Sequence, residues 1–102
     1  MTNEGYYIGS GLKFRVGINV AGFDQEADNY TIDFYCGDKV LHFPKNKVKQ
    51  GADGSFYLPV ETDSLEPGQI KIVVTAYVPD SDFDSGHRKE IAVKKLKWLK
   101  HV

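Results

Sequence analysis

IKIVVTAYV, residues 70–78, is the stretch that decides the fold. Its β-branched and aromatic residues are typical of a β-strand. Val73 and Tyr77 add apolar side chains to the face opposite the isoleucines, and a strand that is apolar on both faces is expected at the centre of a sheet. An acidic, turn-rich segment, residues 79–88, follows it directly. This arrangement predicts a central strand that leads into a loop at one end of the molecule.

Strands on both sides of this run are predicted from the alternation of apolar and polar residues. With the central strand at 69–78, they span residues 12–20, 30–36, 39–43, 55–60 and 88–99. No segment has a helical period, and strands recur about every ten residues. The pattern predicts an all-β fold, an immunoglobulin-like antiparallel β-sandwich of six to seven strands, with a small β-barrel as the alternative. Residues 1–11 lack a period, so we expect a flexible N-terminal arm before one domain at 12–102.

A β-hairpin is predicted at residues 30–43, with Gly37-Asp38 as its turn. Glycine at the first turn position suits a type II′ turn, which fixes the pairing of the strands. The expected partners are Phe34 with Leu41 and Ile32 with Phe43 on the inner face, and Tyr35 with Val40 and Asp33 with His42 on the outer face. Apolar residues meet apolar residues, which supports this register.

The central strand is expected to pair with 55–60 on one side and with 88–99 on the other. The first pairing would place Val60 beside Ile70 and Leu58 beside Ile72. In the second, the apolar alternation of 88–99 slips by one residue, and a bulge at Lys94-Lys95 accounts for the slip. With this bulge, the residues predicted to face the core are Ile91, Val93, Leu96 and Trp98.

Composition limits the classes of function. Apolar residues make up 41% of the chain and charged residues 26%, and the formal net charge of −1 gives no attraction to nucleic acid or anionic membrane. Cys36 is the only cysteine, so no disulfide forms within the chain. No apolar run approaches the roughly 18 residues of a membrane span, and the N-terminus lacks the features of a signal peptide. We expect a cytoplasmic protein, or one that joins a virion in the producing cell.

The C-terminal segment 88–102 has six basic residues and one acidic residue. One reading is a nucleic-acid contact. The favoured reading is protection of an exposed edge strand by lysines, which prevents pairing with other sheets. No nucleic-acid or membrane partner is therefore predicted.

Asp80, Asp82 and Asp84 alternate as at the start of a calcium loop. The rest of that pattern is absent, because Gly86 stands one position too late and Ile91 occupies the position of the bidentate glutamate. The favoured prediction is a solvated turn whose aspartates accept hydrogen bonds from their own backbone, and a metal site is the alternative.

No residue set predicts catalysis or a cofactor. His87 is the only histidine near the aspartates in sequence, too few ligands for a transition metal. His42 opposite Asp33 is interpreted as a structural pair, because no nucleophile accompanies it. Arg88 is expected to pair with an aspartate of the loop, and Phe83 to pack onto the core. We therefore predict a protein that is not an enzyme and binds no cofactor.

Tyr35, Tyr57 and Tyr77 are predicted to point away from the core, with Val73 nearby. Tyrosine is enriched at protein interfaces, so these residues form a candidate protein-contact surface. The alternative is that the arm 1–11 covers them. Protein partners or self-association are expected, and a small-molecule ligand is not.

VAGFD and ADNY, at residues 20–24 and 27–30, and AYVPDSDFDSGHRKE, at 76–90, carry a family resemblance. The chain, from about residue 12 to residue 99, resembles small β-sandwich proteins of prophage and mobile-element clusters in Bacteroides-type bacteria. These are similar in layout to the N-terminal immunoglobulin-like domain of phage baseplate upper proteins. The resemblance implies a structural or adaptor role in a phage tail or baseplate and brings no catalytic residues. The alternative function is a carbohydrate- or calcium-binding module that uses the loop end.

Overall fold

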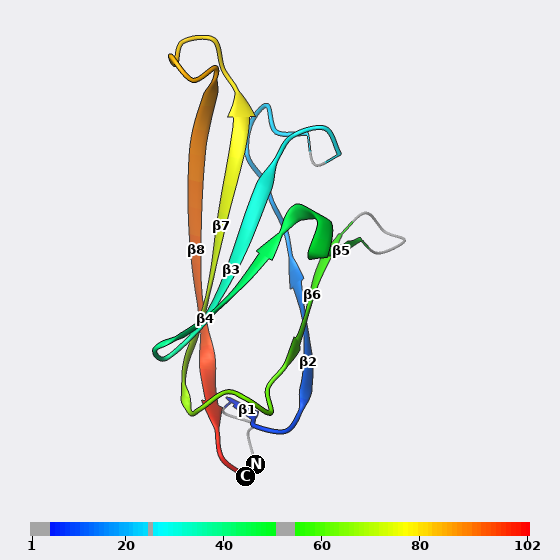
Figure 1. Cartoon of the computed structure of the whole chain (residues 1–102), viewed down its shortest axis with the longest axis vertical. Helices are drawn as coiled ribbons and strands as arrows, with labels where there is room; N and C mark the ends of the chain where they lie inside the picture. The colour runs from blue at the N-terminus through cyan, green and yellow to red at the C-terminus, as the bar shows by residue number, and fades with distance from the viewer. Residues whose placement is uncertain (1–4, 25, 51–54) are drawn as a thin grey trace.

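The computed structural model describes residues 5–24, 26–50 and 55–102, which form eight strands and one short 3-10 helix (Figure 1). In chain order these are β1 (Gly5–Tyr7), β2 (Gly11–Val16), β3 (Tyr30–Cys36), β4 (Lys39–Pro44), the 3-10 helix η1 (Lys45–Lys47), β5 (Lys49–Gln50), β6 (Phe56–Glu61), β7 (Gly68–Pro79) and β8 (His87–Lys100). One sheet has the order β1-β8-β7-β3-β4 and the other β2-β6-β5. Two separate sheets confirm the all-β sandwich, to which β1 and β5 add two short strands.

The core lies between the two sheets. Alternate residues of β3, β6 and β7 are buried, as expected for strands with one face inward. Phe34 on β3 and Leu58 on β6 are fully buried, and the ring of Phe34 lies 5.6 Å from that of Phe14 on β2. Leu65, after β6, is buried at one end of this core. The five-stranded sheet is much wider than the three-stranded sheet that packs on it.

The β3–β4 hairpin forms as predicted. Phe34 pairs with Leu41, and Asp33 pairs with His42, as do the other two expected pairs. Gly37 has a φ of 58°, the value that the first position of a type II′ turn requires. The outer pair is also joined by a side-chain hydrogen bond, with the Nδ1 atom of His42 2.6 Å from the Oδ1 atom of Asp33. Cys36, at the end of β3, is buried.

The neighbours of β7 are β3 and β8, so β7 lies inside the sheet as expected. The predicted pairing of β7 with residues 55–60 is wrong. Those residues form β6, which pairs with β2 and β5 in the other sheet. Their apolar side chains still point inward, but they meet the apolar side chains of β7 across the core instead of beside them.

The register of β8 differs from the prediction. Ile91 pairs with Thr75 and Val93 with Val73, so both point to solvent, with 62% and 57% of their surface exposed. Pairing passes from Gln69–Trp98 to Lys71–Lys95, which places the bulge of β8 after Lys95, opposite Ile70. Leu99 is fully buried, whereas Trp98, expected in the core, is 54% exposed. Of the four β8 residues predicted to face the core, only Leu96 packs against it.

The N-terminal segment is more ordered than expected. Residues 5–7, predicted to be part of a loose arm, form β1, which runs parallel to the end of β8. Residues 1–4 lie outside the described residues. The strand predicted at 12–20 begins at Gly11 and ends at Val16. In the described part of the chain, no helix is long and apolar enough to cross a membrane.

Candidate functional site

The β2–β3 connection lies between the β7–β8 turn, at one end of the molecule, and the β4–β5 connection (Figure 1). The Nζ atom of Lys45 donates hydrogen bonds to the carbonyls of Glu26 and Asp28, at 2.6 and 2.8 Å. Arg88 donates from Nη2 to the carbonyl of Ala21 at 2.9 Å. These contacts join the β2–β3, β4–β5 and β7–β8 connections. The β2–β3 connection is therefore tied to both of the other loops.

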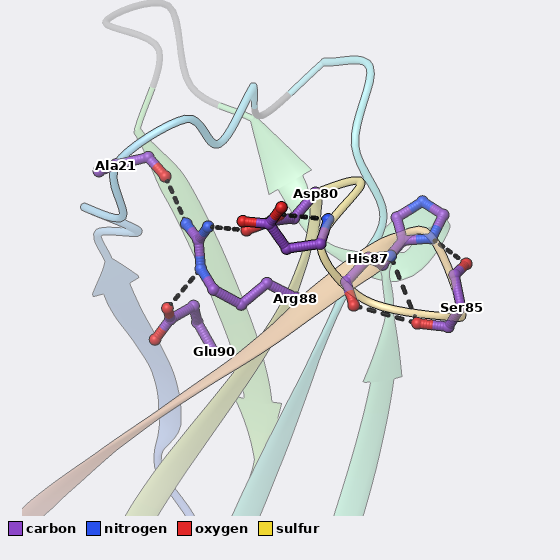
Figure 2. Close-up of polar contacts among 7 residues, drawn as sticks. Ala21, Asp80, Ser85, His87, Arg88 and Glu90 are labelled. Atoms are coloured by element: carbon purple, nitrogen blue, oxygen red, sulfur yellow. Dashed lines mark hydrogen bonds and ion pairs between the residues drawn. The ribbon is translucent and has the colours of Figure 1, made fainter.

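Arg88 is the centre of the polar contacts at this end (Figure 2). Its Nη1 atom lies 2.7 Å from Oδ2 of Asp80, and its Nε atom lies 2.8 Å from Oε1 of Glu90. With the bond to Ala21, the guanidinium group contacts three separate acceptors. The hydrogen bonds to Glu90 and then Asp80 raise the pKa of Arg88. The expected pairing of Arg88 with an aspartate is confirmed, and its role is to connect two loops.

The β7–β8 turn is also closed by its own hydrogen bonds. The backbone N–H of Asp80 donates to the carbonyl of Gly86 at 2.9 Å, and that of Asp82 donates to Oδ1 of Asp80 at 3.0 Å. Ser85 and His87 bond to each other (Figure 2). Phe83, expected on the core, is 49% exposed, because this turn lies beyond the end of the sandwich (Figure 1). The aspartates stabilise a turn, as the favoured interpretation stated.

The alternative metal site has little to support it in this geometry. Both carboxylate oxygens of Asp80 accept hydrogen bonds, one from Asp82 and one from Arg88. Nowhere in residues 5–24, 26–50 and 55–102 do three His, Cys, Asp or Glu side chains gather as metal ligands. A cation at Asp80, Asp82 and Asp84 would therefore compete with Arg88 and with the N–H of Asp82 for the Asp80 carboxylate.

Acid is expected to weaken the Asp80–Arg88 contact. The hydrogen bond from the Asp82 N–H, and then that from Arg88, lower the pKa of Asp80. The carboxylate therefore stabilises the fold above its unfolded pKa of about 3.9, and this stabilisation is lost as the pH falls through the lower folded value. Asp80→Asn should flatten the dependence of unfolding free energy on pH in this acidic range, as measured by urea denaturation. Asp84→Asn, the same change in the same turn, is the control, and equal slopes for wild type and Asp80→Asn would contradict the assignment.

The three candidate tyrosines do not form one surface. Tyr35 on β3 and Tyr77 on β7 share the outer face of the five-stranded sheet with Val73, but Tyr57 lies on β6 in the other sheet. The prediction of one patch is wrong because it placed β6 beside β7. Each ring is half-buried and has a lysine Nζ atom above it. The distance from Nζ to the ring centre is 4.7 Å for Lys71 and Tyr35, 6.0 Å for Lys89 and Tyr77, and 5.4 Å for Lys13 and Tyr57.

Three of the large exposed apolar side chains belong to β8. Ile91, Val93 and Trp98 share one face of that strand, and Val93 pairs directly with Val73. We call these four residues the outer patch. All three β8 residues are predicted from the sequence to face the core, and this prediction is wrong. Counting backward from the buried Leu99 across the bulge would have placed them outside.

A shallow hollow lies beside the outer patch, at the loop end. It is lined by Tyr77 with the polar residues Asn29, Ser85, His87 and Lys89. An aromatic ring among hydrogen-bonding groups is an arrangement that could bind a carbohydrate. The alternative function as a carbohydrate-binding module stays a prediction. The chain matches no protein-family model, no curated protein and no solved structure.

Proposed function

We propose that this protein is a non-enzymatic structural or adaptor module that acts through protein–protein contacts made by the outer patch. The observation that carries the proposal is the exposure of Ile91, Val93 and Trp98 on one flat sheet face. Soluble monomers rarely leave large contiguous apolar patches in water, and the enrichment of aromatic residues is characteristic of interfaces. Lys89 and Lys95 lie on the same face of β8 as the patch, and lysines along this strand would prevent unspecific pairing of the sheet.

We further propose that the assembly is a phage tail or baseplate. Support comes from the two segments that resemble prophage-encoded sandwich proteins. Residues 20–24 and 76–90 are far apart in sequence, yet Arg88 joins them through the carbonyl of Ala21. Gly22 has a φ of 81°, and a Cβ atom at this position would lie 3.5 Å from Cγ1 of Val78. The two segments that carry the resemblance thus contact each other and stabilise the loop end.

The outer patch is tested by Val93→Lys. A lysine beside Val73 would place a charge in the middle of a contact surface, and burial of an unpaired charge is unfavourable. If the chain self-associates, light scattering should show a mass above the 11.5 kDa monomer for wild type and a return toward the monomer for Val93→Lys. If the partner is another protein, co-purification of tail or baseplate proteins from the producing cells should be lost.

Tyr57→Lys is the matched control, because it introduces the same residue on the outer face of the other sheet. It should leave both measurements unchanged. A protein that stays monomeric at high concentration and co-purifies with no tail or baseplate protein would overturn the proposal. Equal losses for Val93→Lys and Tyr57→Lys would show that the outer patch is not the interface.

A further inference from the structure

A groove opens along one side of the sandwich, between β2 and β8. In the described residues β2 pairs only with β6, so it is the edge strand of the narrow sheet on this side (Figure 1). The space beside it measures about 370 Å³. A smaller hollow continues it along residues 17–20. We call the larger space the β2–β8 groove, and its lining includes Phe14, Val16, Ile72, Val74, Ala92 and Lys94.

The groove combines two features that suit an added strand. Its floor is apolar, with Ile72 and Val74 of β7 and Ala92 of β8. Its wall is β2, and the free side of an edge strand presents backbone N–H and C=O groups that can pair with another strand. A strand placed there would extend the narrow sheet over the part of β8 that it leaves uncovered. Such pairing supplies affinity through the main chain and specificity through alternate side chains.

Charge indicates the chemistry of the added strand. Lys94 lines the groove, and Lys13 and Arg15 alternate along the exposed face of β2. Two β2 strands from two copies would bring Lys13 and Arg15 of both copies together on one face, and like charges on neighbouring strands are destabilising. A strand with acidic residues at alternate positions would instead place its carboxylates beside Lys13 and Arg15 on the outer face. Its apolar residues would lie over Ala92 and the methylene groups of Lys94.

We propose that the β2 edge binds an extended segment of a partner protein in which apolar and acidic residues alternate. This deepens the proposed adaptor function and rests on it, because it assigns a second contact surface and the kind of segment that it takes. The surface differs from the outer patch. Val93 borders the groove, but its side chain, like that of Lys95, points to the opposite face of β8, whereas those of Ala92 and Lys94 face the groove.

The test uses a short, terminally blocked peptide of alternating valine and aspartate, with calorimetric titration and amide hydrogen exchange on the full chain. The peptide should bind, and exchange of β2 amides should slow. Ala92→Phe fills the groove and Lys13→Glu reverses a charge beside the carboxylates of the added strand, so each should weaken binding by roughly tenfold or more. Lys95→Glu, the same charge change on the outer face of β8, should leave binding unchanged, as should Val93→Lys. Circular dichroism of each variant checks that the fold is retained.

Three results would overturn the inference. The first is absence of binding by the valine–aspartate peptide, or equal binding by a valine–lysine peptide. The second is equal affinity of wild type, Ala92→Phe and Lys13→Glu for the peptide. The third is a dimer of the chain alone that Ala92→Phe dissociates, which would make a second copy the occupant. Loss of self-association or of tail-protein capture in Val93→Lys alone, with peptide binding intact, would support the outer patch independently.

Discussion

Replacement of Phe34 with alanine is expected to lower the free energy of unfolding by about 3–5 kcal/mol. Phe34 is fully buried in β3, and its ring is 5.6 Å from that of Phe14, which belongs to the other sheet. The ring therefore fills the space between the sheets. Hydrogen-bonded strands cannot move closer to close the resulting cavity, so packing contacts would be lost along with hydrophobic burial. Urea denaturation followed by far-ultraviolet circular dichroism measures the loss.

The matched control is Phe83→Ala in the β7–β8 turn. The same atoms are removed, but Phe83 is 49% exposed and lies outside the core cluster. This change is expected to alter stability by about 0.5 kcal/mol or less. Since domains of this size are stable by only about 5–15 kcal/mol, the difference between the variants is large on the scale of the whole fold. Similar losses for Phe34→Ala and Phe83→Ala would contradict the assigned core.

The β3–β4 hairpin shows what the sequence can determine. Its register depends on a two-residue turn and on local alternation, and both are visible within residues 30–43. Four expected pairs, from Phe34–Leu41 to Asp33–His42, occur in the structure. Local signals of this kind are reliable because strand pairing through a tight turn leaves no freedom of register.

Relations between distant strands are harder to determine. Alternation shows which face of β6 is buried, but a buried face fits equally well beside β7 or opposite it. The same ambiguity affects β8, where Ile91 and Val93 alternate as core residues do and yet face solvent. The sequence analysis placed the bulge at Lys94-Lys95 to keep them inside. The structure places it after Lys95, so that Leu96 and Leu99 are the ones that reach the core.

The candidate site could also be predicted only where its contacts are local in sequence. The aspartate turn and an ion pair of Arg88 with an aspartate follow from short-range chemistry between residues 80 and 88. The bond from Arg88 to Ala21 spans 67 positions, and no local pattern marks it. The outer patch could not be predicted, because exposed apolar residues on a contact surface alternate along a strand in the same way as core residues do.

Thr62→Val is expected to cost about 1–3 kcal/mol through lost hydrogen bonds. Thr62 follows β6 and is fully buried. Its Oγ1 atom accepts a hydrogen bond from the N–H of Gly9 at 2.9 Å and donates one to the carbonyl of Ser10 at 2.7 Å. The hydroxyl thus holds the connection between β1 and β2 against the end of β6. Valine has nearly the same shape, so the change removes both bonds with little change in packing.

Thr62→Ser separates the two contributions of this side chain. Serine keeps the hydroxyl and removes one methyl group, whose burial is worth about 0.8 kcal/mol. The loss in unfolding free energy should therefore be larger for Thr62→Val than for Thr62→Ser. Hydrogen exchange of the Gly9 amide should accelerate in Thr62→Val and stay close to wild type in Thr62→Ser, because only the valine variant leaves that N–H without its acceptor. The reverse order of stability, with unchanged exchange at Gly9 in Thr62→Val, would mean that the methyl group, and not the hydroxyl, attaches the first two strands to the sandwich.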